Sequence, residues 1–506
     1  MSIASKLMCG VLVALVMPGY AAAAVYRSSS DTGVEVLDYI ENRRREERAN
    51  QLSEEQKKLL QDAKNMEATL RQPLDPEQPF PVAFEGEDLT YDEGTGEFRA
   101  VGKVDIIQMD GHRFQGEEVN GNIVEHVIRV PDKAHMLQLS PGAPRITLDG
   151  YNAVYNYADK TGSMENGRGK AREYYITGKR FEFYPDRVVV YDGTQTKCGA
   201  EKPDYHLSAE KIEIWPKQIM KMYNVKLWVK NVVVATKKYH EADLTQTENN
   251  EFPRVGYNKD HGAYIEQDFR YYFTDRFYAR LHAHAETKHG IRSYGDVLYA
   301  NKGFNARAVY GYFEDSNNVW IQKQPGLLLD YSQHFGKSPY GYDLKGEVGR
   351  WKSSSATSTH QYYEADIWRD PIVFHKWMLF LRTGYSITKE SANNSTVRGM
   401  KYDIVLGKDF DPKWAGFVGY HYTKNNTHNS MFDYGVDDYS KKLDAGLSYR
   451  MDDLNRFVVG IKYDVDSERI KDVDYYWYRD LHCSQVIMRY RAKRNKFEVR
   501  WQFTPW

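Results

Sequence analysis

The sequence predicts an all-β protein with a β domain, a C-terminal transmembrane antiparallel β-barrel and a short N-terminal helix. Three observations predict this fold class. Short alternating runs broken by Gly and Asp turns fill residues 82–250. Longer alternating segments of barrel-strand length fill residues 251–506. The last of these segments alternates without a break and is followed by an aromatic residue at position 506.

Composition is compatible with a barrel and argues against bulk binding of nucleic acid. The 506 residues carry 69 Lys+Arg against 70 Asp+Glu, so no net basicity attracts a polyanion. The negative mean hydropathy would ordinarily indicate a water-soluble protein. A barrel escapes that inference, because every second strand residue faces the lumen and the average stays polar.

The first 24 residues have the pattern of a secretory signal peptide. Lys6 precedes an apolar run from Leu7 to Met17, and the small residues Ala21–Ala24 offer a cleavage site. A transmembrane anchor is the alternative, but this run is too short to span a bilayer as a helix. We therefore expect an exported protein cut near Ala24.

Residues 25–81 are expected to form a helical segment and a Pro-rich linker. Charged, helix-favouring residues carry a thin apolar stripe that begins with Val36, Leu37 and Ile40. This pattern predicts a solvated or partner-binding helix, or a simple tether. Four prolines between Pro73 and Pro81 then predict an extended linker.

Residues 82–250 contain an internal repeat. Gly86 and Gly150 are separated by the same number of residues as Tyr91 and Tyr155, and a looser third unit follows His206. Each unit has the pattern of a strand, a turn and a second strand, with apolar side chains on one face. Stacked units of this kind predict a jelly roll or an open β-solenoid with an apolar groove.

Residues 251–506 are predicted to form about 14 barrel strands, with a margin of about two. Most of the 40 tyrosines lie between Tyr257 and Tyr490, and aromatic residues gather near the ends of the expected strands. Girdles of this kind mark the two membrane interfaces of an outer-membrane barrel.

The terminal strand is the clearest barrel signal. Its large apolar side chains are predicted to face lipid, while Glu498, Arg500 and Gln502 would face the lumen. An edge strand of a soluble sandwich is the alternative, but such a hydrophobic edge would promote aggregation in water. The residues of this C-terminal barrel signal are Phe497, Val499, Trp501, Phe503 and the final aromatic Trp506.

Removal of the signal peptide leaves two cysteines, Cys198 and Cys483. In an oxidising compartment a pair of cysteines suggests one disulfide. Two free thiols that never meet are the alternative, which the residues alone leave open.

Motifs of catalysis are missing from the sequence, so we expect no enzyme and no cofactor. The sequence contains neither a Gly-x-Ser-x-Gly elbow nor a phosphate-binding loop. His282 and His284, with His289 nearby, could share a strand face and bind a metal. Polar residues that face a barrel lumen need no metal, so we expect none.

Three segments together resemble the LptD (OstA) family of lipopolysaccharide-assembly proteins. The repeats at Phe84–Val104 and Leu148–Lys170 resemble OstA-type repeats. The stretch from Thr194 to Cys198, followed by Pro203–Ile212, is similar to that family's junction between periplasmic domain and barrel. The stretch Arg479–Cys483 resembles the family's segment before its last strands.

The resemblance implies a translocon of the outer membrane with its N-terminal domain in the periplasm. The jelly roll would receive lipopolysaccharide or a related lipid from a periplasmic bridge protein of the same fold, and the barrel would deliver it to the outer leaflet. It also implies a Cys198–Cys483 disulfide, assembly by the barrel-assembly machinery and a possible plug lipoprotein. Candidate groove residues are Leu89, Tyr91, Phe98, Val104, Ile106 and Phe114.

One departure from the family is the length of the barrel. Well-known members have a much larger barrel, so this chain would be a short-barrel variant. The alternative function is a porin-like diffusion channel with an accessory periplasmic domain. A lipid hydrolase is the third possibility, but it would require a nucleophile and base that the sequence does not contain as a motif.

Overall fold

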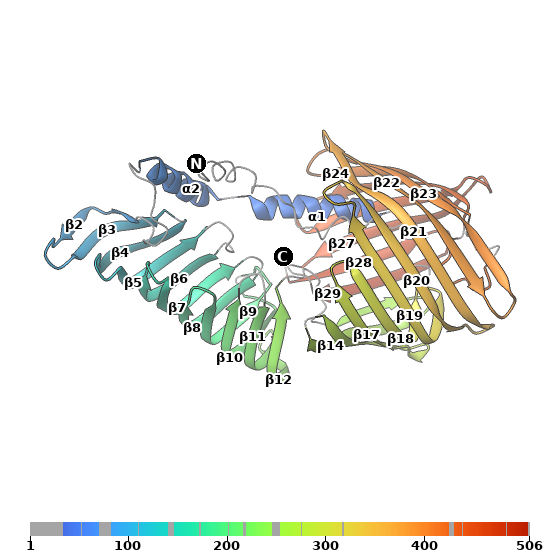
Figure 1. Ribbon diagram of the computed structural model, residues 1–506, viewed down its shortest axis with the longest axis horizontal. Coiled ribbons are helices and arrows are strands. Elements are labelled where there is room, and N and C mark those ends of the chain that lie inside the picture. Colours follow the sequence, from blue (N-terminus) through green and yellow to red (C-terminus); the bar gives the residue numbers. More distant parts are fainter. Residues whose placement is uncertain are drawn as a thin grey trace, which may run out of the picture. The chain divides into compact units, whose positions relative to one another are not determined.

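The computed structural model is all-β apart from two helices (Figure 1). It describes residues 34–51, 53–69, 82–109, 111–139, 146–171, 174–200, 202–215, 219–244, 253–274, 276–315, 318–424, 430–437, 439–481 and 483–503. The predicted signal peptide, the Pro-rich linker and Trp506 lie outside these residues.

The chain divides into two compact units. The barrel unit comprises Met1–Ala49, Asn250–Asp480 and Val486–Gln502, and the sheet unit comprises Asn50–Asn249, Leu481–Gln485 and Phe503–Trp506. A single N-terminal helix was expected, whereas the structure has α1 (Glu35–Asn50) and α2 (Glu54–Thr69). Helix α1 belongs almost entirely to the barrel unit and α2 to the sheet unit. The N-terminal segment therefore contributes one helix to each unit and is not a simple tether.

The sheet unit contains a 12-stranded antiparallel sheet whose order follows the chain from β3 onward. This connectivity is a meander, and the predicted jelly roll is not confirmed by it. The strands are β1 (Val82–Glu85), β2 (Asp88–Tyr91), β3 (Glu97–Gln108), β4 (His112–Asn122), β5 (Val127–Gln138), β6 (Ile146–Asn156), β7 (Thr161–Ala171), β8 (Tyr174–Phe183), β9 (Val188–Thr196), β10 (Tyr205–Trp215), β11 (Ile219–Val229) and β12 (Val232–Asp243).

Many of these strands are interrupted near the middle by a residue with positive φ. Lys103 (φ 48°), Asn152 (50°), Asn166 (46°), Asp192 (46°) and Asn224 (53°) all adopt this left-handed conformation. Asn and Asp tolerate it better than most side chains. Register shifts occur at the same level in several strand pairs, which is the geometry of a β-bulge. Each strand therefore bends there, and the sheet has two halves.

The two halves enclose one apolar core. Side chains from both sides of the bend contribute, as in β8, where Ile176 precedes the bend and Phe181 follows it. The polar bulge residues lie outside the core and pair along the bend. Asn152 donates to Glu165 at 2.9 Å, and Lys179 contacts Asp192 at 3.1 Å. A bent amphipathic sheet thus buries its apolar face against itself.

Helix α2 packs on the outer face of the first strands. Its N-terminus is a capping box in which Ser53 Oγ accepts from Gln56 N at 3.2 Å and Gln56 Oε1 accepts from Ser53 N at 3.0 Å. Leu59 is fully buried, α2 contacts β3, and Glu55 lies 3.1 Å from His135 on β5. Helix α2 therefore covers one end of the sheet.

A closed antiparallel barrel forms the second unit (Figure 1). Within the described residues it has 16 strands when the two-residue β16 is counted with β17, whereas about 14, with a margin of two, were expected. The strands are β13 (Arg254–Asn258), β14 (Gly262–Thr274), β15 (Phe277–Glu286), β16 (Gly290–Ile291), β17 (Tyr294–Asn301), β18 (Phe304–Glu314), β19 (Trp320–His334), β20 (Tyr340–Lys352), β21 (Thr357–Phe374), β22 (Trp377–Glu390), β23 (Ser395–Asp409), β24 (Trp414–Thr423), β25 (Lys441–Arg450), β26 (Asn455–Asp464), β27 (Arg469–Asp480), β28 (Ser484–Arg491) and β29 (Lys496–Phe503).

Side chains alternate between the outside and the lumen along the barrel strands. On β23, Ile404 is 47% exposed while its neighbour Val405 is fully buried. An outward apolar belt of this kind is the surface of a membrane-spanning barrel. Its members include Ile265, Leu281, Leu327, Leu344, Ile367, Ile404, Val418 and Leu447, all exposed. Among the described helices, neither is long and apolar enough to cross a membrane.

The terminal strand β29 closes the barrel against β13 through a short ladder from Val255↔Trp501 to Asn258↔Glu498. Phe497 is exposed as predicted for a lipid-facing residue, and Val499 and Trp501 are half-buried. Phe503 departs from the prediction, because its ring packs against Tyr205 with centroids 4.8 Å apart. The barrel thus has one short closing seam, which we call the β13–β29 seam.

Substitution of Ile404 by arginine should destabilise the barrel by about 2–4 kcal/mol, because it places a charge in the middle of the lipid-facing belt. Denaturant unfolding in lipid vesicles measures the effect. Lys408→Arg is the matched control, since Lys408 already places its ammonium 4.1 Å from the Trp377 ring near the end of the same strand. Equal stability of both variants and the wild type would contradict a lipid-facing Ile404.

Candidate functional site

An apolar cleft lies between the two halves of the bent sheet. One wall comes from β6, β7 and the first half of β8. The other wall comes from the second half of β8 and from β9, β10 and β11. The volume of the cleft is about 60 Å³, so the two halves of the sheet lie close together. The lining residues are Ile146, Thr147, Leu148, Gly169, Lys170, Ala171, Tyr174, Ile176, Phe181, Phe183, Val188, Ile214, Met220 and Leu244.

Four of the six predicted groove residues are brought together in the core of the sheet unit. Phe98, Val104, Ile106 and Phe114 are each at most 5% exposed. None of the six lines the cleft, which lies several strands further along the sheet. The sequence repeat located the amphipathic strands, but it did not show which side chains border the opening.

Leu89 and Tyr91 were predicted to line the groove, but they are 58% and 48% exposed. Both lie on β2, which with β1 pairs to β3 at the first edge of the sheet. An edge strand has fewer neighbours to cover its side chains. Their exposure therefore belongs to the edge of the sheet and not to its apolar interior.

A buried ion pair lies on the outer face beneath α2. Arg113 Nε donates to Asp105 Oδ1 at 2.8 Å, and the second guanidinium nitrogen contacts the other carboxylate oxygen. This hydrogen bond to Asp105 raises the pKa of the Arg113 guanidinium. The pair joins β3 to β4.

In the barrel unit, helix α1 packs against the lumen wall. Val36, Leu37 and Ile40 are at most 1% exposed and belong to one cluster with inward-facing strand residues. The helix also has acidic residues in its first turn and Arg48 in its last turn, as the helix dipole favours. The wall residues of the cluster are Met378, Phe380, Val405, Ala415, Phe417, Val458 and Tyr478.

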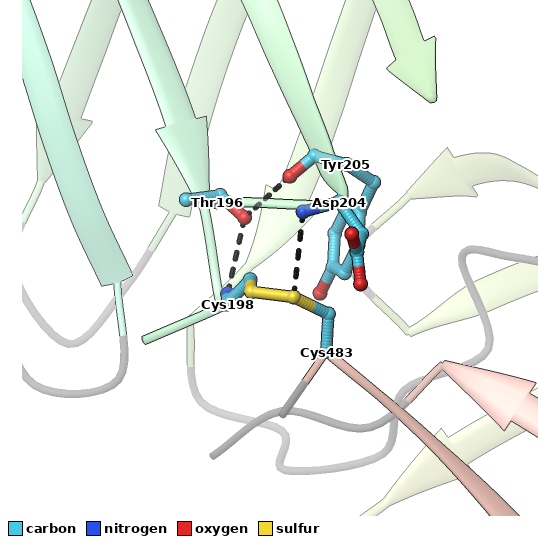
Figure 2. Close-up of a disulfide and its surroundings, with 5 residues drawn as sticks. All are labelled: Thr196, Cys198, Asp204, Tyr205 and Cys483. Carbon is cyan, nitrogen blue, oxygen red and sulfur yellow. Dashed lines mark hydrogen bonds between the residues drawn. A yellow bond between two sulfur atoms is a disulfide. The ribbon is translucent and has the colours of Figure 1, made fainter. Parts of the chain in front are cut away.

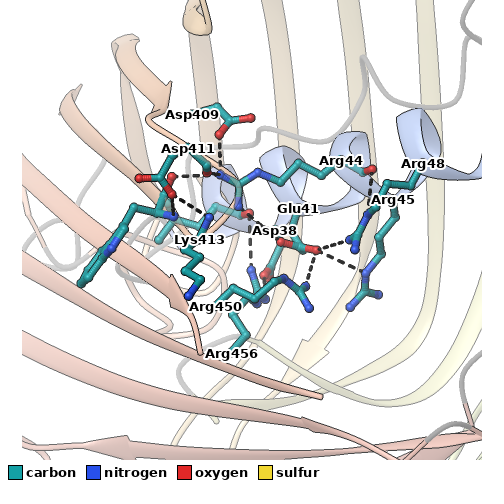
Figure 3. A network of polar contacts seen from close by, with 12 residues as sticks. Asp38, Glu41, Arg44, Arg45, Arg48, Asp409, Asp411, Lys413, Arg450 and Arg456 are labelled. Carbon is teal, nitrogen blue, oxygen red and sulfur yellow. Dashed lines mark hydrogen bonds and ion pairs between the residues drawn. The ribbon is translucent and has the colours of Figure 1, made fainter. Parts of the chain in front are cut away.

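Ion pairs attach the polar face of α1 to the barrel (Figure 3). Glu41 is 3% exposed and pairs with Arg450 on β25, and Asp38 pairs with Arg456 on β26. Arg44 pairs with Asp409 and donates to the Trp414 carbonyl at 2.9 Å. Since a buried charge is costly without a partner, these pairs hold α1 in one register.

The contacts of α1 lie toward the barrel end that carries the loop of Cys483, which we call the Cys483 end. At the opposite end, the segment 430–437 turns inward. Phe432 is 3% exposed and packs with Ile321 and Trp351, and Gly435 N donates to Asp315 at 3.0 Å. Helix α1 and the segment 430–437 thus occupy part of the lumen near opposite ends of the barrel.

Between α1 and the segment 430–437, charged residues on the lumen wall form a network of ion pairs. Glu364 on β21 contacts Lys345 at 2.5 Å and also contacts Lys401 on β23. Asp366 pairs with Arg382 on β22. Opposite charges on adjacent strands satisfy one another across the ladder, so the lumen is polar, as in water-filled barrels.

A disulfide joins Cys198 and Cys483, with their Cα atoms 4.7 Å apart (Figure 2). Both cysteines are 1% exposed. Thr196 Oγ1 accepts from Cys198 N at 3.0 Å, and Asp204 N lies 3.4 Å from Cys483 Sγ. The bond ties the chain after β9 to the loop between β27 and β28, as the family resemblance implies.

The sequence missed the position of α1. Its apolar stripe was recognised, but a stripe of three apolar residues among charges is equally typical of a solvated helix. The feature that could have indicated its position is the combination of this apolar stripe with the many acidic and basic residues around it. Such a helix suits a polar lumen with apolar patches better than it suits water.

Comparison with known proteins identifies no family. No family model matches the chain, and no curated protein matches it. Solved structures of mutants of the Rhodopseudomonas blastica porin resemble it distantly. One is 9% identical with a TM-score of 0.30 and covers 50% of this chain and 97% of that porin. A triple mutant is 9% identical with a TM-score of 0.29 and covers 49% and 96%. The barrel assignment rests on the strand pairing of this chain.

Ile40→Asp should release α1 from the lumen, because it places a carboxylate against the apolar wall. We expect a several-fold rise in single-channel conductance in planar bilayers. Asn42→Asp, which introduces the same charge at an exposed position of α1, is the control and should behave as wild type. Identical conductance of both variants would contradict the burial of Ile40.

Cys483→Ala should abolish the shift in electrophoretic mobility between reduced and non-reduced samples, since the bond closes a loop with a sequence separation of 285. Leu481→Ala, at an exposed position of the same loop, should keep the shift. If non-reduced Cys483→Ala migrated as non-reduced wild type does, the Cys198–Cys483 disulfide would be contradicted.

Proposed function

We propose that this protein is an outer-membrane translocon for lipopolysaccharide or a related lipid, with its sheet unit in the periplasm. The observation that carries the proposal is the apolar cleft between the halves of the bent sheet. Acyl chains require an apolar path across water, and the cleft is lined almost entirely by apolar side chains. The disulfide then couples the lipid-carrying strands to the barrel sequence.

Lipid entry requires the two halves of the sheet to separate. The space of about 60 Å³ accommodates only a few methylene groups. The hinge for such opening is the row of bulges, where the ladder hydrogen bonds are already interrupted. Lys170 lines the cleft and would offer a cation to a lipid phosphate, while the acyl chains lie on Ile176 and Phe181.

The first edge of the sheet suits a periplasmic bridge protein of the same fold. Within the described residues, β1 and β2 pair with β3 on one side and have no strand on the other. Edge strands of this kind bind partners by strand addition. The exposed Leu89 and Tyr91 would extend the apolar surface of such a junction.

On the barrel side, the short β13–β29 seam supports lipid exit. Fewer residues pair at this seam than between the long central strands, which extend up to β21 (Thr357–Phe374). Separating a short ladder breaks fewer backbone hydrogen bonds. Lipid would then reach the outer leaflet sideways, with no need to pass the lumen filled by α1. That helix also occupies space which a plug lipoprotein would require.

A porin-like diffusion channel with an accessory domain is the second candidate. The closed barrel of 16 strands favours it, because barrels of this size enclose an aqueous lumen. Helix α1 and the segment 430–437 argue for a closed resting state. A channel would therefore need a signal that withdraws α1.

A photo-crosslinking amino acid at Ile176 should capture lipopolysaccharide in the native cell, because this side chain borders the cleft. The same amino acid at Tyr151, which is 45% exposed on β6, should capture none. Immunoblotting against lipopolysaccharide detects the adduct. Equal adducts at both positions, or none at Ile176, would defeat the assignment of the cleft.

Depletion of the protein separates the two candidate functions. A translocon predicts loss of newly made lipopolysaccharide from the cell surface, measured by extracellular labelling. Normal surface lipopolysaccharide together with reduced solute uptake would favour the channel and refute the translocon.

A further inference from the structure

Four histidines gather near the barrel end opposite Cys483. His261 lies in the turn between β13 and β14, His282 and His284 lie on β15, and His289 lies in the turn before β16. Carboxylates from β14, β15 and β18 lie among them.

Glu286 is the centre of the cluster, and its side chain has no solvent exposure. One carboxylate oxygen lies 2.9 Å from His261 Nδ1, and the other lies 2.7 Å from His289 Nδ1. One ligand atom from each of these three residues lies within 4.8 Å of the others. Zinc–nitrogen bonds are about 2.0–2.1 Å long, so small side-chain shifts bring all three onto one ion.

A second carboxylate orients His261. Its Nε2 lies 2.6 Å from Glu314 Oε1, and Asn318 Nδ2 donates to that same oxygen at 2.9 Å. A metal-binding imidazole characteristically donates its other ring N–H to a carboxylate. A proton on Nε2 shared with Glu314 would leave the Nδ1 lone pair of His261 directed toward Glu286 and His289.

Aromatic packing fixes the rings. Trp320 lies edge-on to His261 with centroids 5.6 Å apart, and it also packs against His284 at 5.5 Å. His261 is 2% exposed, whereas the side chain of His289 is 40% exposed. A preorganised, half-accessible set of two imidazoles and one carboxylate is a donor set that zinc uses.

We propose that His261, Glu286 and His289 bind one divalent transition-metal ion of the zinc type, with water as a fourth ligand. Glu314 is a positioning residue that holds His261. The ion would tie the β13–β14 turn to the end of β15, and so would brace the wall next to the β13–β29 seam. This inference does not depend on the lipid cargo.

The test is Zn²⁺ titration by calorimetry of the full chain in detergent, after chelation, dialysis and removal of any affinity tag. We expect one Zn²⁺ per wild-type chain and loss of this binding in His289→Ala. Glu314→Gln should weaken it by about 10- to 100-fold. His334→Ala, whose imidazole pairs with Asp370 toward the Cys483 end, should bind as wild type. Heat-dependent electrophoretic migration checks that each variant is folded.

A second readout identifies the ligands. Co²⁺ bound in place of Zn²⁺ should give the intense visible absorption of a four-coordinate site, and His289→Ala should remove it. Absence of Zn²⁺ binding in wild type would overturn the proposal. So would unchanged binding in His289→Ala, or loss in His282→Ala alone, which would place the ion at the neighbouring trio of Glu266, His282 and His284.

Discussion

The burial of α1 against the barrel wall is the interaction on which the functional account of the barrel depends. A barrel of 16 strands has a wide lumen, and its inward face is polar. Helix α1 complements that face in two ways. Leu37 and Ile40 cover the apolar patch around Phe380, while Glu41 pairs with Arg450. Removing either partner of a buried pair leaves a desolvated charge, so the helix and the wall specify one another.

This constraint changes what the barrel can do. Helix α1 near one end and the segment around Phe432 near the other both narrow the lumen for solutes. Lipid movement is less affected, because an acyl chain gains nothing from a polar lumen. The apolar cleft of the sheet and the short β13–β29 seam provide surfaces that suit a lipid better. Both surfaces support the proposal of a lipid cargo.

Sequence periodicity predicted the fold class because alternation directly encodes which face of a strand is apolar. Phe98, Val104, Ile106 and Phe114 were predicted on this basis to line a groove, and they are buried in the core instead. Leu89 and Tyr91 have the same pattern but lie on an edge strand, and alternation carries no information about edges. About 14 barrel strands were expected, with a margin of two, and the barrel has 16. The histidine cluster was noticed at His282 and His284, but its centre at Glu286 depends on pairing between distant turns.

Direct crosslinking of α1 is the most decisive measurement. A photo-reactive amino acid at Leu37, followed by mass spectrometry of the isolated outer membrane, reports what surrounds this side chain. We expect crosslinks to inward-facing residues of β22 to β24, such as Phe380 and Phe417. Crosslinks to lipid, to other proteins or to the sheet unit would contradict the helix-filled barrel.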